Sequence, residues 1–182
     1  MKISFLIIFL IIFGFIIGEV EELLNPFLLL YSEQFNYLVT HGYYYEILTS
    51  IFVTNSFFDA AFNVVSMYVI YLLFRSRAGW LEIVVFLVGG IVGNVFSLFY
   101  YPPLTLSAGA SGGIFAVLSY YIFHDFLKEK EMGIYGLFYL FVIFMISDFV
   151  FPNVDMIAHI GGIVSGITLG GAVSLKKDSG KV

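Results

Sequence analysis

The chain consists of long apolar stretches separated by short polar segments. A helix needs about 20 largely apolar residues to cross the hydrocarbon core of a bilayer, and six stretches approach that length. The pattern therefore predicts an all-α membrane protein with six transmembrane helices. They run from Ile3 to Gly18, Phe57 to Phe74, Ile83 to Tyr101, Ser111 to Phe126, Met132 to Val150 and Met156 to Leu175.

Two segments depart from a simple alternation of spans and short loops. The fourth stretch is short and ends in His124 and Asp125, so its first residues are expected to lie below the membrane surface, where a loop reaches them. The segment from Glu19 to Ser56 is long and rich in Phe and Tyr, which settle at membrane interfaces. We expect a partly helical external loop embedded in the membrane there, with a merely interfacial loop as the alternative.

The basic residues predict the orientation, because Lys and Arg in short loops stay on the cytoplasmic side. With six crossings all of them fall on one side, so both termini of this multi-pass, integral cell-membrane protein are expected to be cytoplasmic. Residues 1–175 then form one membrane domain, and 176–182 form a short charged cytoplasmic tail. A cleaved signal peptide is the alternative for the first stretch, although no small-residue cleavage site precedes Glu19. The basic residues are Lys2, Arg75, Arg77, Lys128, Lys130, Lys176, Lys177 and Lys181.

Composition excludes several classes of protein. The chain is 60% hydrophobic with a mean hydropathy of +1.00, and only 12% of its residues are charged, against about 25% in soluble domains. The absence of cysteine excludes disulfides, thiolate metal sites and cysteine nucleophiles. The sequence contains no basic patch interleaved with aromatic residues, so we do not expect a nucleic-acid partner.

The candidate chemistry lies in two residues at the outer ends of two spans. Ser111 opens the fourth span and His159 lies one turn inside the sixth, and both spans descend from the external side, so the two side chains enter at similar depth. An imidazole that takes the serine proton makes the hydroxyl a nucleophile. His124 is excluded as the base, because thirteen residues along one helix separate it from Ser111 by about 20 Å.

The surroundings of this pair suit acyl-transfer chemistry. At a helix N-terminus the first backbone N–H groups lack intrahelical acceptors, so the N–H of Ser111 is a candidate oxyanion donor, and the flanking Gly109 and Gly112 leave space for a substrate backbone. Gly162, Gly166 and Gly170 recur every four residues, which allows a neighbouring helix to approach closely. Helix packing alone explains the same glycines, and the identity of the neighbour decides between the two interpretations.

Four motifs together resemble the rhomboid family of intramembrane serine proteases in its minimal six-span form. The likeness covers nearly the whole chain in family order. The motifs are Gly109-Ala110-Ser111-Gly112, Ala158-His159-Ile160-Gly161-Gly162 with Gly166, Gly89-Gly90 with Gly93-Asn94, and Leu48-Thr49-Ser50-Ile51-Phe52 ahead of Phe62-Asn63.

The resemblance implies a rhomboid-like bundle and a role for each matching residue. Ser111 corresponds to the nucleophile and His159 to the general base, while Asn63 corresponds to a side-chain oxyanion donor that acts with the Ser111 N–H. Phe115 matches the aromatic position on which the catalytic histidine packs, with Gly109, Gly112 and Gly162 as supporting residues. The family uses a dyad without a third acidic member; Asp155, four residues before His159, is the alternative third member. No metal or other cofactor is implied.

Two positions depart from the family pattern. Asp59 replaces a histidine common in the oxyanion region, and an ionised carboxylate there would repel an oxyanion. Three possibilities remain for Asp59. It is neutral and a third candidate oxyanion donor, its side chain is turned away from the oxyanion, or it plays no part in the reaction. Glu46 stands where a Trp-Arg pair is common, which leaves open how the external loop is anchored.

The implied function is hydrolysis of peptide bonds in or near transmembrane segments of other membrane proteins, through an acyl-enzyme. A monomer within the lipid bilayer is sufficient for this chemistry. One alternative is a catalytically inactive relative that binds membrane clients, which Asp59 favours. The other is a small transporter whose pathway includes Asp148 and Asn94.

Overall fold

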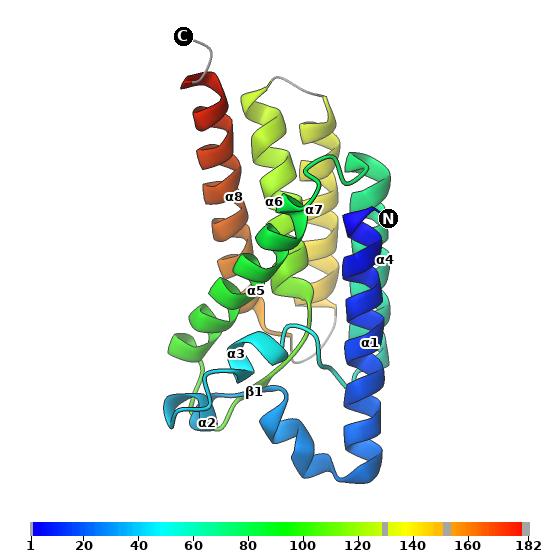
Figure 1. The fold of residues 1–182 in the computed structure, drawn as a ribbon, viewed down its shortest axis with the longest axis vertical. Coiled ribbons are helices and arrows are strands. Elements are labelled where there is room, and N and C mark those ends of the chain that lie inside the picture. The colour runs from blue at the N-terminus through cyan, green and yellow to red at the C-terminus, as the bar shows by residue number, and fades with distance from the viewer. Residues whose placement is uncertain (1, 129–130, 151–153, 180–182) are drawn as a thin grey trace.

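Six long helices form a bundle (Figure 1) in the computed structural model, which describes residues 2–128, 131–150 and 154–179. The first of these helices and the second are joined by a long connection, and shorter connections follow. The bundle consists of α1 (Ile3–Leu24), α4 (Phe57–Phe74), α5 (Leu81–Tyr100), α6 (Ser111–Leu127), α7 (Met132–Phe149) and α8 (Met156–Ser179).

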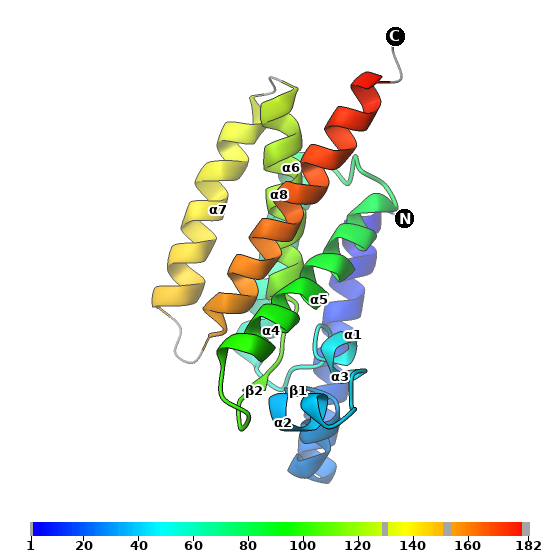
Figure 2. The ribbon, with the colours of Figure 1, turned by 90° about the vertical axis from the view of Figure 1, so that its left-hand side faces the viewer.

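The predicted helical membrane bundle is confirmed. Among the described residues, five helices are long and apolar enough to cross a membrane: α1, α4, α5, α7 and residues 156–174 of α8. The remaining bundle helix, α6, has 17 residues and is buried continuously from Gly112 to Ile122, because α5, α7 and α8 pack around it (Figure 2). A helix that is apolar and buried on all sides occupies the centre of a bundle.

The glycine stripe of α8 packs against α6. A Cβ at Gly162 would lie 2.1 Å from the carbonyl oxygen of Gly112, and one at Gly166 would lie 2.2 Å from that of Ala116. Real Cβ atoms do not approach a backbone oxygen so closely, so these positions require glycine. The neighbour that the sequence left open is therefore the helix that begins with Ser111.

The first helix is longer than predicted. It continues past Gly18 to Leu24, because Glu and Leu are good helix formers outside the apolar stretch as well as within it. It ends at Asn25, which is extended and precedes Pro26, as proline disfavours helical conformation in the residue before it. The last helix, α8, extends to Ser179, which is within the predicted tail 176–182, and residues 180–182 lie outside the described part of the chain.

A buried polar cluster fixes α1 to the start of α5. The hydroxyl of Ser4 contacts Ser76 and donates to the carboxylate of Glu82, while the Tyr121 hydroxyl donates to Glu82 Oε2 at 2.5 Å. All four residues are buried. Buried polar groups are stable only when paired, so this cluster sets the relative positions of α1, α5 and α6 at the end where the chain starts.

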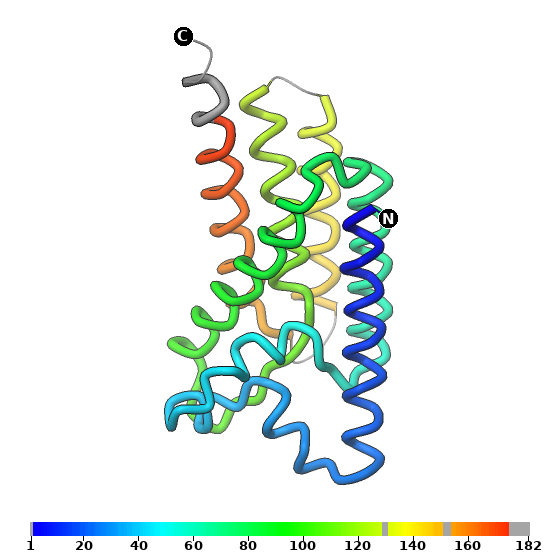
Figure 3. Tube along the Cα trace, viewed as in Figure 1, coloured from blue at the N-terminus to red at the C-terminus, as the bar shows by residue number. Residues whose placement is uncertain are grey.

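The long connection between α1 and α4 is partly helical, as expected, and it folds back on the segment before α6 (Figure 3). Gln34 pairs with Ser107 and Phe35 with Leu106 in a two-stranded antiparallel ladder. This connection lies at the end of the bundle opposite the start of α1 and the end of α8 (Figure 1). Its elements are η1 (Pro26–Tyr31), β1 (Gln34–Phe35), α2 (Asn36–Thr40) and α3 (Glu46–Thr49), and the partner strand is β2 (Leu106–Ser107).

Glu46 and Asn94 anchor this connection. Glu46 is buried, and its Oε2 accepts a hydrogen bond from the backbone N–H of Phe35 at 2.9 Å. The Asn94 amide donates from α5 to the carbonyl of Ile47 at 2.8 Å and to Ser50 Oγ at 2.9 Å. A carboxylate and an amide thus anchor the loop from within, which answers the question raised by the missing Trp-Arg pair.

Replacing Glu46 with glutamine is expected to flatten the pH dependence of stability. Burial raises the pKa of Glu46 from 4.5 to about 7, against the lowering effect of the Phe35 hydrogen bond. Between these values the folded chain binds more protons than the unfolded chain, so stability falls as pH rises from 4.5 to about 7. Glutamine keeps the acceptor for the Phe35 N–H but does not ionise. Thermal unfolding in detergent across this pH range measures the difference.

The stability of the Glu46→Gln variant is still expected to depend on pH, because Glu33 also has a raised pKa. Burial is the main cause, and the charges of Glu21, Asp59 and Glu22 add to it, so that the pKa of Glu33 is about 7. Glu33→Gln is therefore the matched control, and the double variant should show the smallest slope. Equal slopes in the wild type and Glu46→Gln would show that Glu46 is already ionised in the folded chain.

Candidate active site

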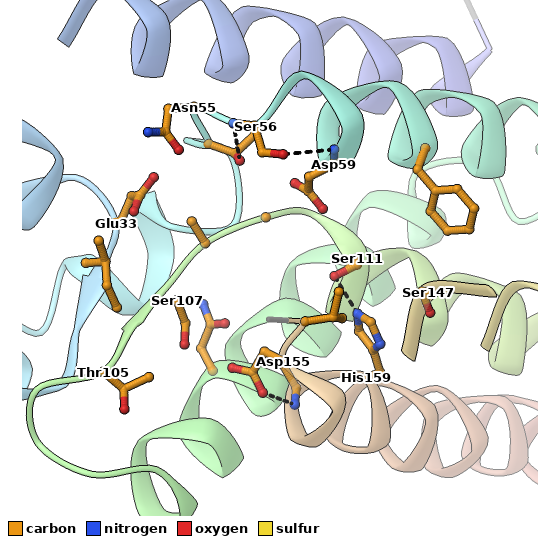
Figure 4. A pocket seen from close by; sticks show the side chains of 18 of the residues that line it. Glu33, Asn55, Ser56, Asp59, Thr105, Ser107, Ser111, Ser147, Asp155 and His159 are labelled. Atoms are coloured by element: carbon orange, nitrogen blue, oxygen red, sulfur yellow. Dashed lines mark hydrogen bonds between the residues drawn. The ribbon is translucent and has the colours of Figure 1, made fainter. Parts of the chain in front are cut away.

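A cavity of about 630 Å³ lies between the α1–α4 connection, the segment before α6, and the starts of α6 and α8 (Figure 4). Its walls combine apolar surface with a number of polar side chains, although the helices around it are mainly apolar. Its polar lining includes Glu33, Asp59, Ser107, Ser111, Asp155 and His159.

Ser111 and His159 meet in this cavity. Ser111 is the first residue of α6, and its Oγ lies 2.8 Å from Nε2 of His159 in the first turn of α8. The imidazole is 1% exposed and rests against the ring of Phe115, with centroids 4.4 Å apart. The close backbone approach at Gly162 and Gly112 brings the two helices to this separation. The hydroxyl is therefore placed to give its proton to the imidazole.

Gly109 shapes the entry to α6. Its φ is +123°, a conformation that favours glycine, and a Cβ there would lie 2.8 Å from Oδ2 of Asp59. Its N–H donates to the carbonyl of Ser50 at 2.8 Å, which joins the segment before Ser111 to the anchored connection. The position of the serine hydroxyl thus depends on the external loop as well as on the bundle.

Asn63 and Asp59 are bonded to each other on α4. The Asn63 amide donates to Asp59 Oδ1 at 3.0 Å, and Asp59 lines the same cavity as Ser111. Asp59 is not turned away from the cavity, and in this contact it accepts a hydrogen bond rather than donating one. Asn63 is buried, and its amide has a second N–H that the Asp59 contact does not use.

Asp155 does not contact the imidazole through its side chain. Its Oδ1 accepts the backbone N–H of Ala158 at 2.9 Å, and its Oδ2 accepts from the Ser97 hydroxyl. These bonds make Asp155 the N-cap of α8, where a carboxylate pairs one of the free N–H groups of the first turn. Its proximity to His159 in sequence reflects helix capping.

Asp148 is the residue that sequence reasoning did not place in the site. Both of its carboxylate oxygens lie 2.9 Å from Nδ1 of His159, and its side chain is fully buried. A signal existed: a carboxylate at the outer end of an apolar span needs a partner, and the ascending α7 ends on the side where α6 and α8 begin. The three residues thus lie in a continuous hydrogen-bonded row.

The residues of the proposed transport pathway are engaged elsewhere. The Asn94 amide anchors the external connection, and Asp148 is bonded to the histidine. Among the described residues, no group of three or more His, Asp and Glu side chains is arranged to hold a metal ion.

The sequence is similar to a known protein family and to two curated proteins. The family model for the rhomboid domain matches residues 41–176. The protein named "Putative rhomboid protease YdcA" from Bacillus subtilis (strain 168) is 24% identical over 148 residues, which cover 79% of this chain and 74% of the relative. Rhomboid protease GluP of the same organism is 27% identical over 147 residues, 78% of this chain but 28% of the longer relative.

Proposed function

This chain belongs to the rhomboid family, and we propose that it is an intramembrane serine endopeptidase that cleaves peptide bonds in or near transmembrane segments of other membrane proteins. The observation that carries the proposal is the 2.8 Å contact between Ser111 Oγ and His159 Nε2. This contact lies in a cavity lined in part by polar side chains, within a protein that is otherwise mainly apolar.

Acylation begins with proton transfer. His159 Nε2 takes the proton of Ser111 as Oγ bonds to the scissile carbonyl carbon, whose π electrons move onto its oxygen. The N–H of Ser111 and the second amide N–H of Asn63 are the donors that stabilise this oxyanion. The tetrahedral intermediate then breaks its C–N bond, and the imidazolium gives its proton to the leaving amine.

Hydrolysis of the acyl-enzyme needs water at the same place. The cavity extends from Ser111 to Thr105 and Ser107 in the segment before α6, which provides a polar route through the outer part of the protein. His159 takes a proton from the entering water, the new C–O bond forms, and the Ser111–acyl bond breaks as Ser111 recovers a proton.

The partners that follow from this function are transmembrane proteins in the same bilayer. A substrate helix must unwind locally, since an α-helix engages its carbonyls in hydrogen bonds and shields them from attack. We propose that both termini are cytoplasmic, because Lys2 precedes α1 while Arg75 and Lys128 follow α4 and α6, whereas the cavity is lined by the starts of α6 and α8. One copy of the chain supplies every group used.

An inactive, client-binding relative is the second candidate. Asp59 favours it, because a carboxylate beside the nucleophile opposes the charge that develops on an oxyanion. The hydrogen bond from Asn63 moderates this effect by compensating part of the Asp59 charge. The two candidates differ in whether Ser111 is reactive.

A fluorophosphonate probe is expected to label the purified wild-type protein at Ser111, because phosphonylation uses the same hydroxyl and base as acylation. The measurement is probe incorporation followed by peptide mapping. Ser111→Ala should abolish labelling, whereas Ser107→Ala, a matched change of another serine in the cavity, should retain it. Absence of labelling in folded wild-type protein would favour the client-binding alternative, and a label on Ser107 would identify a different nucleophile.

A further inference from the structure

The row of residues in the cavity does not end at the histidine. Asp148 is the second-to-last residue of α7. Both of its carboxylate oxygens lie 2.9 Å from Nδ1 of His159. This nitrogen is on the side of the imidazole ring that faces away from Ser111. Resting on the proposed function, we infer that Asp148 is a positioning residue that holds His159 in the form able to accept the serine proton.

The chemical reason is the tautomer of the imidazole. A neutral imidazole carries its single proton on either Nδ1 or Nε2, and only the form protonated at Nδ1 leaves Nε2 free to accept. An ionised carboxylate has no proton to give, so its contact with Nδ1 requires an Nδ1–H donor. Asp148 therefore selects the tautomer in which Nε2 accepts from Ser111.

The carboxylate is itself held in place. The hydroxyl of Ser147 donates to Asp148 Oδ2 at 2.8 Å. The Phe115 ring supports the imidazole from α6, while Asp148 reaches it from α7. Two helices thus fix both the plane and the rotation of the ring.

Burial strengthens the effect. The Asp148 side chain is fully buried and His159 is 1% exposed, so water does not replace the carboxylate as a partner of Nδ1. When His159 takes the serine proton it becomes a cation, and the adjacent negative charge stabilises it.

The test compares Asp148→Asn with Asp148→Glu in steady-state cleavage of a reconstituted transmembrane substrate. Asparagine presents an N–H to Nδ1 and favours the wrong tautomer, so kcat should fall by about 10²- to 10⁴-fold with KM nearly unchanged. Glutamate restores the carboxylate and should recover part of the loss. Asp155→Asn removes a second carboxylate near the ring and should lower kcat by less than about tenfold, because that side chain does not contact the imidazole.

A second measurement is independent of activity. With His41 and His124 replaced by glutamine, ¹⁵N NMR of labelled histidine reports His159 alone; the wild-type background should show a proton on Nδ1, and Asp148→Asn should shift the population toward Nε2–H. Unchanged kcat in Asp148→Asn, an equal loss in Asp155→Asn, or a wild-type imidazole protonated at Nε2 would overturn the inference. Absence of cleavage by the wild type would instead count against the protease proposal, and the tautomer would still test Asp148.

Discussion

Replacing Ser111 or His159 with alanine is expected to lower cleavage of a co-reconstituted transmembrane substrate by more than about 10³-fold. Without Oγ no acyl-enzyme forms, and without Nε2 the hydroxyl keeps its proton at neutral pH. Because the two groups act as one unit across their 2.8 Å contact, the double variant should be no slower than either single variant. Initial rates of product formation in proteoliposomes give all three values.

Ser107→Ala provides the control for this series, since it deletes a hydroxyl from the same cavity while leaving the dyad in place. It should retain turnover within about tenfold of the wild type, as expected for a residue outside the reacting groups. Thermal unfolding of each variant establishes that the fold is intact. Turnover retained in folded Ser111→Ala or His159→Ala would refute the dyad.

Gly162→Ala is expected to damage both the fold and the chemistry. The added Cβ would lie 2.1 Å from the backbone oxygen of Gly112, so the two helices must separate. Overpacking of this kind costs about 1–3 kcal/mol, and a displacement of about 1 Å between reacting groups lowers rates by about 10²-fold. We expect a lower melting temperature together with a rate loss of that size.

Gly171→Ala is the matched control on the same helix. Its Cβ would meet the edge of the Phe123 ring at 3.1 Å, and a side chain yields more readily than a backbone. This variant should keep nearly wild-type stability and rate. Equal behaviour of the two alanine variants would show that the α6–α8 contact does not position the dyad.

The sequence predicted the helical bundle well, because long apolar stretches are easy to recognise in a sequence. Long apolar stretches set the helices, and the start of α6 at Ser111 and the bounds of α4 at Phe57 and Phe74 agree with the structure. The end of α1 was misplaced by six residues, from Gly18 to Leu24, because hydropathy marks the limit of lipid contact and not the limit of the helix.

The candidate site was only partly accessible to sequence reasoning. Ser111 and His159 stand at motifs and at matching depth, so their meeting was foreseeable. Asp148 comes from a third helix without a motif, and the sequence does not show that its side chain reaches His159. Asp155 was considered only as an alternative third member, because it lies four residues before His159, but a carboxylate just before a helix more readily caps that helix.

The cluster around Glu82 bears on the order of assembly. Ser4 and Glu82 are 78 positions apart in the chain, and synthesis delivers the N-terminal segment first. Burying an unpaired carboxylate in a membrane is costly. The Ser4 hydroxyl, which pairs with the Glu82 carboxylate, belongs to the helix that is synthesised first. Although the family match begins only at residue 41, α1 thus supplies the hydroxyl that pairs with the acidic start of α5 in the folded bundle.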